Sequence, residues 1–434
     1  MKDLKIHPLR AERRRRALTQ QQLADFTQVS LSTIERAEHG ESIRADNQRR
    51  ICDYLKKTPE ELGLVSEESI NQDKQTSTGT DNTLYTTAPI QSTIQTYLPP
   101  TRFLTMKPDE LIRRYTDESG RLLELKAEGI NWTLPQVVVF DNSQAHLPLS
   151  TIRVEVDPSK PVYTIPTKLE GKATDILEEL EPYFHDSTTI RLSGICQTEQ
   201  TLTLIVSKAN YLQYVATNYA MDALLTEKGW TRSLRDTVHP TAQLCTLEES
   251  LLANHIGIGT LVFTIDNYLI LPIRSKENVG IWRQEISPSI SGATSYDDDM
   301  YSTKSGPLSS WMREGREELG IDNNDFIEES SIFLGITREL LRGGKPEMFF
   351  ATQLHITRAK LEQKFHKARD RWENMKLDWL EFANPLTPPT TKQEHSLLLQ
   401  DFSRLLHQYE TRLAPPMKAN LALWFRYLCS FPMN

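Results

Sequence analysis

The chain has 434 residues, of which 38% are hydrophobic and 25% are charged, a composition typical of globular proteins with two or three domains. It contains no apolar run long enough to span a bilayer, and its amino terminus is too charged for a secretory signal. We therefore expect a cytoplasmic protein with no membrane partner. The four cysteines lie far apart, which indicates neither a disulfide framework nor a zinc motif.

The net charge of −8 is unevenly distributed along the chain. Residues 1–65 hold 13 Lys or Arg against 10 Asp or Glu, a net charge of +3, which leaves −11 for the remainder. An acidic body does not bind DNA phosphates by itself, so only the first segment is a candidate for DNA binding.

Composition and hydrophobic periodicity predict a multidomain chain. Residues 1–65 have the pattern of a compact set of short helices, and residues 66–101 are Ser/Thr-rich and poor in large apolar side chains, which predicts a flexible linker. Residues 102–250 mix strand and helix patterns and predict an α+β domain to which we assign no role. Residues 251–434 predict a further α+β domain with a helical carboxyl-terminal extension.

Several individual elements follow from the same patterns. Strands are predicted at 136–141, 151–156, 201–206, 257–264, 268–275 and 347–356, with a turn at Asp266 and Asn267. Apolar residues at helical spacing predict helices over 210–225, 360–375 and 394–413.

The segment ALTQQQLADFTQVSLSTIERAEHG, residues 17–40, contains two short helical patterns separated by a tight turn. Thr19 and Ser30 are candidate N-caps, and Ile34 and Ala37 are expected to point inward from the second helix. This is the arrangement of a helix-turn-helix, although an ordinary helical hairpin has the same spacing.

The motif T-Q-x-x-L-A, followed by V-S-x-S-T-I-x-R and E-x-G, resembles the phage repressor and Cro family, also called XRE, over residues 7–65. The resemblance implies a double-stranded DNA operator, a homodimer, and a buried salt bridge between Arg13 and Glu38. It places the second helix in the major groove. The implied DNA-binding residues are Gln20 at a phosphate and, at or beside the base edges, Leu31, Ser32, Thr33, Glu35 and Arg36.

Arg36 is the candidate for direct base recognition, because its bidentate fork fits the O6 and N7 atoms of guanine. Leu31 and Ser32 offer only an apolar contact and one hydroxyl group. The basic run Arg13 to Arg16 either contacts phosphates, through at least one of Arg14 to Arg16, or is solvated charge.

The stretch MREGREELGI, from Met312 to Ile321, concentrates acidic residues on a predicted helix. Glu314, Glu317 and Glu318 are spaced i, i+3 and i+4 and would share one face. Crowded carboxylates suit Mg²⁺ or Mn²⁺ as a cofactor. The alternative is a solvated acidic face that Arg313 and Arg316 partly neutralise.

The sequence R-E-G-R-E-E-L-G-I resembles the second half of the Nudix box, and the resemblance extends over about residues 254–356. It implies an α/β/α sandwich in which a metal lies between Glu317, Glu318 and a diphosphate. Glu314 would ligate the metal or activate water as the catalytic residue. Arg274, at the end of the preceding strand pair, is a candidate ligand-binding residue.

The chain departs from the Nudix box in its first half. Gly292 stands where the box glycine belongs but is too far from Arg313, and Ser305 replaces the expected glutamate. Gly315 replaces an aliphatic residue, which costs about 1 kcal/mol of helix stability relative to Ala. The insertion carrying Asp297 to Asp299 either replaces the missing acid or is a solvated loop. With the stretch Tyr211 to Asn218, of the form Y-x-x-Y-x-A-T-N, it resembles a branch of bacterial Nudix-like proteins.

Two functions of different classes fit these observations. The first is a transcriptional regulator whose Nudix-like domain senses a nucleotide or nucleoside-diphosphate derivative. The second is a Mg²⁺-dependent Nudix hydrolase that carries an accessory DNA-binding domain. The broken first half of the box favours the regulator. A nucleotide-sanitising enzyme would need a base-recognition pocket that the sequence does not locate.

Overall fold

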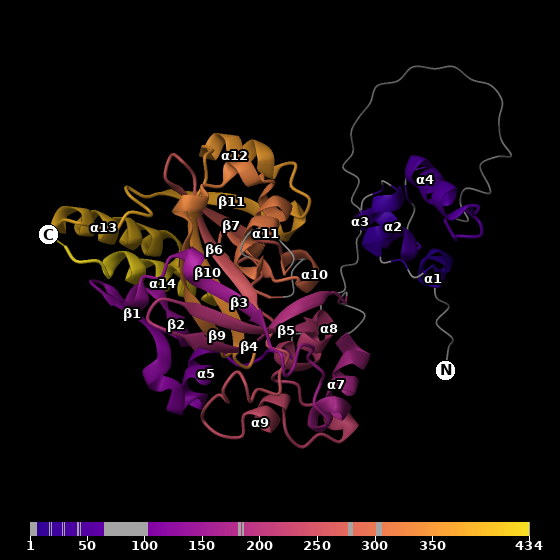
Figure 1. Cartoon of the computed structure of the whole chain (residues 1–434), viewed down its shortest axis with the longest axis horizontal. Coiled ribbons are helices and arrows are strands. Elements are labelled where there is room, and N and C mark those ends of the chain that lie inside the picture. Colours follow the sequence, from indigo (N-terminus) through magenta and orange to yellow (C-terminus); the bar gives the residue numbers. More distant parts are fainter. Residues whose placement is uncertain are drawn as a thin grey trace, which may run out of the picture. The chain divides into compact units, whose positions relative to one another are not determined.

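The computed structural model forms two compact units, residues 1–92 and 93–434, which are drawn in Figure 1. It describes residues 7–16, 18, 20–27, 29, 31–40, 43, 45–64, 103–180, 184, 186–276, 281–300 and 306–433. The predicted linker, the candidate caps Thr19 and Ser30, and Ser305 lie outside the described residues. Residues on both sides of the predicted boundary at 250 and 251 belong to the second unit.

The first unit contains four helices in its described part, in agreement with the predicted compact set of short helices. They are α1 (Pro8–Arg15), α2 (Gln20–Thr27), α3 (Leu31–Glu38) and α4 (Ala45–Leu55). Each helix contributes fully buried aliphatic side chains to one core, including Leu9, Leu23, Ile34 and Leu55. Ile34 and Ala37 are both buried, so the predicted inward face of α3 is confirmed.

The second unit contains an eight-stranded mixed sheet. In chain order its strands are β1 (Leu122–Ala127), β2 (Ile130–Asp141), β6 (Gly257–Phe263), β7 (Tyr268–Arg274), β8 (Ile290–Ala293), β9 (Ile332–Glu339), β10 (Lys345–Gln353) and β11 (Asn374–Glu381). They are ordered β1-β2-β9-β10-β6-β7-β11, with β8 paired to β6. β10 and β6 run parallel, and the other pairs are antiparallel. Because β2 pairs with β9, the segment before residue 250 is part of the same sheet.

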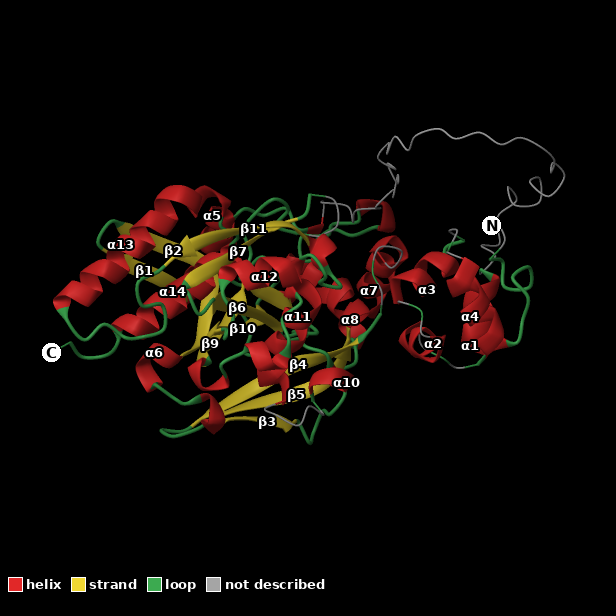
Figure 2. Cartoon of the chain, turned by 90° about the horizontal axis from the view of Figure 1, so that it is seen from above, coloured by secondary structure: helices red, strands yellow, loops and turns green. Residues whose placement is uncertain are grey.

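Helices pack on both faces of this sheet (Figure 2). On one face, Phe263 contacts Trp424 of α14 (Pro415–Cys429), whose ring stacks on Phe402 of α13 (Lys392–Tyr409). On the other face, Phe350 packs against Trp311 of α11 (Ser310–Leu319), and α12 (Arg358–Phe365) joins the same core. Side chains of adjacent strand residues point to opposite faces of the sheet. Because helices cover both faces, the side chains on both are buried.

A smaller sheet and two helical elements complete the part of the fold that forms the site. The strands β3 (Ile152–Val156), β5 (Leu202–Asn210) and β4 (Thr188–Gln197) are ordered β3-β5-β4 and lie together in Figure 2. After β5 the chain forms α8 (Tyr211–Tyr214) and a π-helical turn at Val215–Tyr219, which pack against α7 (Thr167–Leu180). The short helices are α5 (Pro108–Arg114), α6 (Asn142–Ala145), α9 (Leu234–Val238) and α10 (Tyr296–Asp299).

Two predicted helices differ from the structure. The pattern over 210–225 becomes only α8 and the π-helical turn, and the pattern over 360–375 ends at Phe365. The chain then enters β11, which pairs with β7 along its whole length. In both places long-range packing overrides the local periodicity.

Candidate functional site

The described part of α2 and α3 has the arrangement of a helix-turn-helix. A buried ion pair fixes it, because Arg13 of α1 donates from Nε to Glu38 of α3 at 2.5 Å and from Nη2 at 3.0 Å. The predicted pair Arg13 and Glu38 is thus confirmed. Gln20 also binds this carboxylate, with Nε2 2.8 Å from Glu38 Oε2. In this structure the Gln20 amide therefore supports α3.

The predicted base-reading residues occupy the outer part of α3. Arg36 is exposed, and Leu31, Thr33 and Glu35 are partly exposed. Leu31 also packs on the core of the unit. Ser32 belongs to α3, but its side chain lies outside the described residues, as do those of Arg14 and Arg15.

Arg16 takes part in the fold of the first unit. It donates from Nε to Glu12 at 2.8 Å and from Nη2 to the Leu55 carbonyl at 2.5 Å. These contacts tie the end of α1 to the end of α4. The Glu12 carboxylate compensates the charge of Arg16 within the unit.

The second unit contains a cavity of about 340 Å³. That volume is typical of sites for small ligands. Its walls come from β7, β8, β10, α8, α11 and the loops around 281–288 and 342, so residues far apart in the sequence converge on it. Acidic side chains and Arg274 line one part, a paired charged cluster lines another, and aromatic rings line a third.

The acidic part is built by α11 against β8. The Glu314 carboxylate accepts from the Ala293 amide at 3.3 Å, and Glu318 accepts from the Ser291 amide at 3.3 Å. Both glutamates line the cavity, so one turn of α11 presents two carboxylates to the same space. Gly315, between them, is closely packed: a Cβ there would lie 2.8 Å from Ile290 Cδ1, so a larger residue would force neighbouring side chains to shift.

Burial and neighbouring negative charges raise the pKa of both carboxyl groups. Burial raises the pKa of Glu314 to about 7. The negative charges of Glu317 and Glu373 raise it as well, whereas the positive charge of Arg313 lowers it. Burial raises the pKa of Glu318 well above its usual range, and Glu373 and Glu314 raise it further. A cation bound here would relieve both burial and repulsion.

Arg274 is weakly engaged beside these acids. Its Nη2 lies 3.6 Å from Glu373 Oε2 and its Nη1 lies 3.4 Å from Ser291 Oγ. Its buried Nε has no hydrogen-bond partner among the described residues. Because Arg274 lines the cavity, its guanidinium has donor capacity that a ligand there could use.

Glu317 does not join Glu314 and Glu318 in the cavity wall. Its carboxylate accepts from Arg313 Nη1 and from Arg369 Nη1, each at 3.1 Å. The structure thus separates the adjacent acids that the sequence predicts as a metal pair. Within the described ranges, no group of three or more His, Cys, Asp or Glu side chains is arranged to hold a metal ion.

The acidic insertion has structural contacts where it is described. Asp297 pairs with Lys208 at 3.0 Å and accepts from Thr188 at 2.8 Å. Asp299 is buried and pairs with Arg313, Nε to Oδ1 at 3.2 Å. Neither lines the cavity, and the side chain of Asp298 lies outside the described residues.

The paired charged cluster surrounds Arg342. Its guanidinium donates to Glu339, to Glu347 Oε1 at 2.7 Å and to the Tyr214 hydroxyl at 3.2 Å. Lys345 Nζ donates to the same Glu347 oxygen at 2.6 Å, and burial lowers the pKa of Lys345 to about 8. The charges of this cluster are largely compensated by one another.

Aromatic rings form the third part of the wall. The rings of Tyr211 and Tyr214 lie 5.3 Å apart, and that of His255 lies 5.7 Å from the first and 5.0 Å from the second. Phe184 and Tyr219 continue the series at 5.2 Å, and Trp282 also lines the cavity. Burial raises the pKa of Tyr211 and Tyr214, which keeps both hydroxyls protonated at neutral pH.

The stretch Tyr211 to Asn218 positions this wall. The Asn218 side chain accepts a hydrogen bond from the backbone N–H of Asn254 at 2.8 Å and donates one to the backbone carbonyl of Arg342 at 3.0 Å. It thereby links the π-helical turn to the residue before His255 and to the charged cluster. Single π-helical turns are frequent at functional sites. The motif itself can be recognised in the sequence. Its contacts with residues 254 and 342 cannot be predicted from local patterns, because these segments are far apart in the chain.

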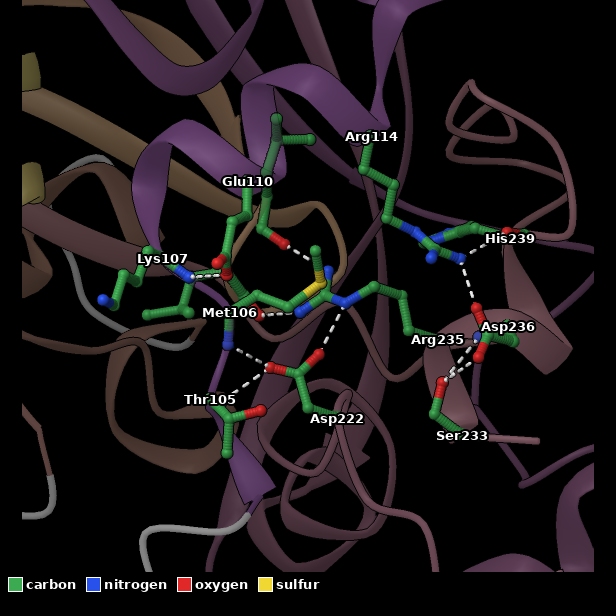
Figure 3. Close-up of polar contacts among 12 residues, drawn as sticks. Thr105, Met106, Lys107, Glu110, Arg114, Asp222, Ser233, Arg235, Asp236 and His239 are labelled. Carbon is green, nitrogen blue, oxygen red and sulfur yellow. Dashed lines mark hydrogen bonds and ion pairs between the residues drawn. The ribbon is translucent and has the colours of Figure 1, made fainter. Parts of the chain in front are cut away.

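A second network supports the turn that carries Arg342 (Figure 3). Arg235 of α9 donates to the carbonyls of Leu340 and Leu341, each at 2.7 Å, and to Asp222 Oδ1 at 2.7 Å. Asp222 also accepts from the Thr105 amide at 2.7 Å. Figure 3 shows the Asp222 carboxylate between the Arg235 side chain and Thr105. Arg235 is fully buried, and its bonds to the two carbonyls hold the turn in place.

Residues 7–64 match the family model of a helix-turn-helix domain. The first unit thus carries a helix-turn-helix domain, which indicates a DNA-binding regulator. No curated protein matches the chain. The crystal structure of DR0079 from Deinococcus radiodurans is similar over 39% of this chain and 80% of that chain, with 14% identity and a TM-score of 0.23. At that TM-score the likeness indicates neither the fold nor the function of the second unit. No described helix is both long enough and apolar enough to cross a membrane.

Proposed function

We propose that the protein is a transcriptional regulator whose second unit senses a nucleotide or a nucleoside-diphosphate derivative. The observation that carries the proposal is the cavity, which combines aromatic rings, a cation with a free donor at Arg274, and the carboxylates of Glu314 and Glu318. A base, a diphosphate and a divalent metal need these three kinds of partner. The helix-turn-helix domain supplies the DNA-binding part.

The proposal includes Mg²⁺ or Mn²⁺ at the acidic part of the cavity. Mg²⁺ is usually held by one or two carboxylates together with phosphate oxygens and waters, so a complete protein cage is not needed. Glu314 and Glu318 would provide the carboxylates, and their raised pKa values fit groups that a cation would keep ionised. Arg274 would bind the phosphate oxygens that the metal leaves free.

Regulation requires that the ligand bind two states of the protein with different affinity. We propose a homodimer that reads two half-sites, with the nucleotide changing the fit of the two helix-turn-helix domains to an operator. One repressor-type domain alone reads few base pairs, which is why a dimer is required.

A second candidate function, hydrolysis of a nucleoside-diphosphate linkage, is favoured by one observation. A carboxyl group with a pKa of about 7, such as Glu314, is matched to general-base catalysis near neutral pH. In this alternative Glu314 would accept a proton from the attacking water.

The test is a thermal-shift screen of nucleotides with the full-length protein, with and without Mg²⁺, followed by analysis of each binder for hydrolysis. A ligand that binds only the folded state raises the unfolding temperature. Binding without turnover, together with a changed affinity for duplexes selected from a random library, is expected for the regulator. Multiple turnover without an effect on DNA binding would support the hydrolase, and no nucleotide binding would reject both.

A further inference from the structure

His255 is a buried side chain with two polar ring nitrogens. It is 1% exposed, and neither Nδ1 nor Nε2 has a hydrogen-bond partner among the described residues. It lines the cavity. A buried donor or acceptor without a partner is costly, so such a group in a cavity wall points to a ligand that supplies the partner.

The charge state of His255 limits what that ligand can be. Burial lowers its pKa well below the usual range, and the positive charges of Lys345 and Arg342 lower it further. At neutral pH the ring is therefore uncharged and offers one N–H donor and one acceptor nitrogen. A phosphate can use only the N–H donor of this ring, whereas a neutral heterocycle that both accepts and donates can use both ring nitrogens.

Arg342 and Arg274 both line the cavity, but they differ in how many of their hydrogen-bond donors are free to bind a ligand. Arg342 uses all three of its guanidinium nitrogens on Glu339, Glu347 and Tyr214. Arg274 makes only long contacts and keeps a buried Nε without a partner in the described structure. A phosphate is thus better served beside Arg274, which leaves the aromatic part for an uncharged group.

We infer that Tyr211, Tyr214 and His255 form a subsite for the heterocyclic base of a nucleotide, with its phosphates directed to Arg274. The inference rests on the proposed function and adds the orientation of the ligand and the residues that recognise its ring. It also gives a role to the segment before residue 250, because α8 supplies both tyrosines. The partly exposed ring of Tyr211 offers stacking surface, Tyr214 backs it from the buried side, and His255 supplies the hydrogen bond.

The experiment uses calorimetry on the full-length protein in Mg²⁺, with pyrophosphate and the 5′-diphosphates of adenosine, guanosine, cytidine and uridine as probes. We expect at least one nucleoside diphosphate to bind tenfold or more tightly than pyrophosphate. His255→Phe keeps a flat ring but removes both nitrogens. It should remove at least tenfold of that gain and leave pyrophosphate affinity unchanged.

A structural role for His255 predicts a different pattern. If His255 only supports the fold, His255→Phe should lower the unfolding temperature and weaken pyrophosphate and nucleotide to the same extent. Our inference predicts that the unfolding temperature of the unliganded variant is not lowered, because the buried groups without partners are gone. If His255→Phe fails to fold, Tyr211→Leu is the second variant, and it should likewise weaken only the nucleoside diphosphates.

Tyr427→Leu is the matched control, because Tyr427 packs against His146 and Phe431 and does not line the cavity. It should leave all five affinities unchanged. Equal affinity for pyrophosphate and every nucleoside diphosphate would overturn the base subsite while leaving a diphosphate site at Arg274. If none of the five probes binds, the proposed sensor itself is rejected.

Discussion

The carboxyl group of Glu314 lies directly against the backbone of Gly292. A Cβ built at Gly292 would lie 2.2 Å from Glu314 Cδ and 2.3 Å from Oε1, so any side chain at this position would force the Glu314 carboxyl group to move. Gly292 therefore provides the space in which β8 and α11 bring a carboxylate to the cavity. The glycine has a packing role at the site even though its spacing departs from the Nudix box.

We expect Gly292→Ala to displace the Glu314 side chain without unfolding the protein. The carboxyl group is the flexible end of its side chain, so overpacking should cost no more than about 1–3 kcal/mol. Mg²⁺-dependent nucleotide affinity should fall at least tenfold, measured by calorimetry. Gly171→Ala is the control, since Gly171 is exposed in α7 and a Cβ there meets nothing within 4 Å. It should stabilise α7 by up to about 1 kcal/mol.

The ion pair of Arg13 and Glu38 should dominate the stability of the helix-turn-helix domain. Glu38→Ala leaves the guanidinium of Arg13 buried without its partner, and such losses cost about 3–5 kcal/mol. Chemical denaturation of the full-length protein, followed by a probe in the first unit, measures the change. Glu61→Ala removes an exposed partner of Lys57 and should change the midpoint little. Equal effects of the two variants would contradict the structural role of the buried pair.

The helix-turn-helix could be predicted because its signals are local. Caps, apolar spacing and a tight turn lie within residues 17–40, and the inward positions Ile34 and Ala37 follow from helical periodicity. The strands β6, β7 and β10 were predictable for the same reason, since each is a continuous apolar run next to a turn or loop.

The cavity could be predicted only in part. Arg274, Glu314 and Glu318 follow from the box-like motif, but Glu317 points to Arg369, and nothing near residue 317 in the sequence indicates that contact. The aromatic wall was not predictable from local patterns, because Tyr214 and His255 meet through long-range packing. The pairing of β2 with β9 was missed for the same reason: register between distant strands is set by the assembled core.

Arg36 should govern the base preference of the DNA-binding domain. It is exposed on α3, and we expect Arg36→Ala to cost about 1–3 kcal/mol on the preferred duplex and to relax preference at one base-pair step. Competition binding against single-base variants measures both effects. Arg36→Lys keeps the charge but loses the bidentate fork, so it should retain more non-specific affinity than Arg36→Ala. A uniform loss on all sequences would make Arg36 a phosphate contact.

The raised pKa of Glu314 predicts how the stability of the unliganded protein depends on pH. The folded state holds this proton up to about pH 7, whereas the unfolded state releases it near 4.5. The contribution of this group is therefore fully present below pH 4.5 and is lost as pH rises through 7. Glu314→Gln should flatten the fall in unfolding temperature between pH 5 and 8, measured by thermal melts. If the variant shows the same fall as the parent protein, Glu318 or Glu373 causes it.

Glu317 and Glu318 are adjacent in sequence but differ in their surroundings, which allows a matched comparison. Glu318 lines the cavity beside Arg274, whereas Glu317 is held by Arg313 and Arg369 outside its wall. Glutamine has a helix propensity similar to that of glutamate, so Glu318→Gln and Glu317→Gln should both keep α11 intact. We expect Glu318→Gln to weaken Mg²⁺-dependent nucleotide binding at least tenfold, which is about 1.4 kcal/mol, and Glu317→Gln to change it less than threefold. Titrations in Mg²⁺ and then in chelator measure this difference.

If Glu317→Gln has the larger effect, the metal lies between the two adjacent glutamates as the box implies, and α11 must turn when the ligand binds. If both variants bind as the parent protein does, with or without chelator, these glutamates hold no metal.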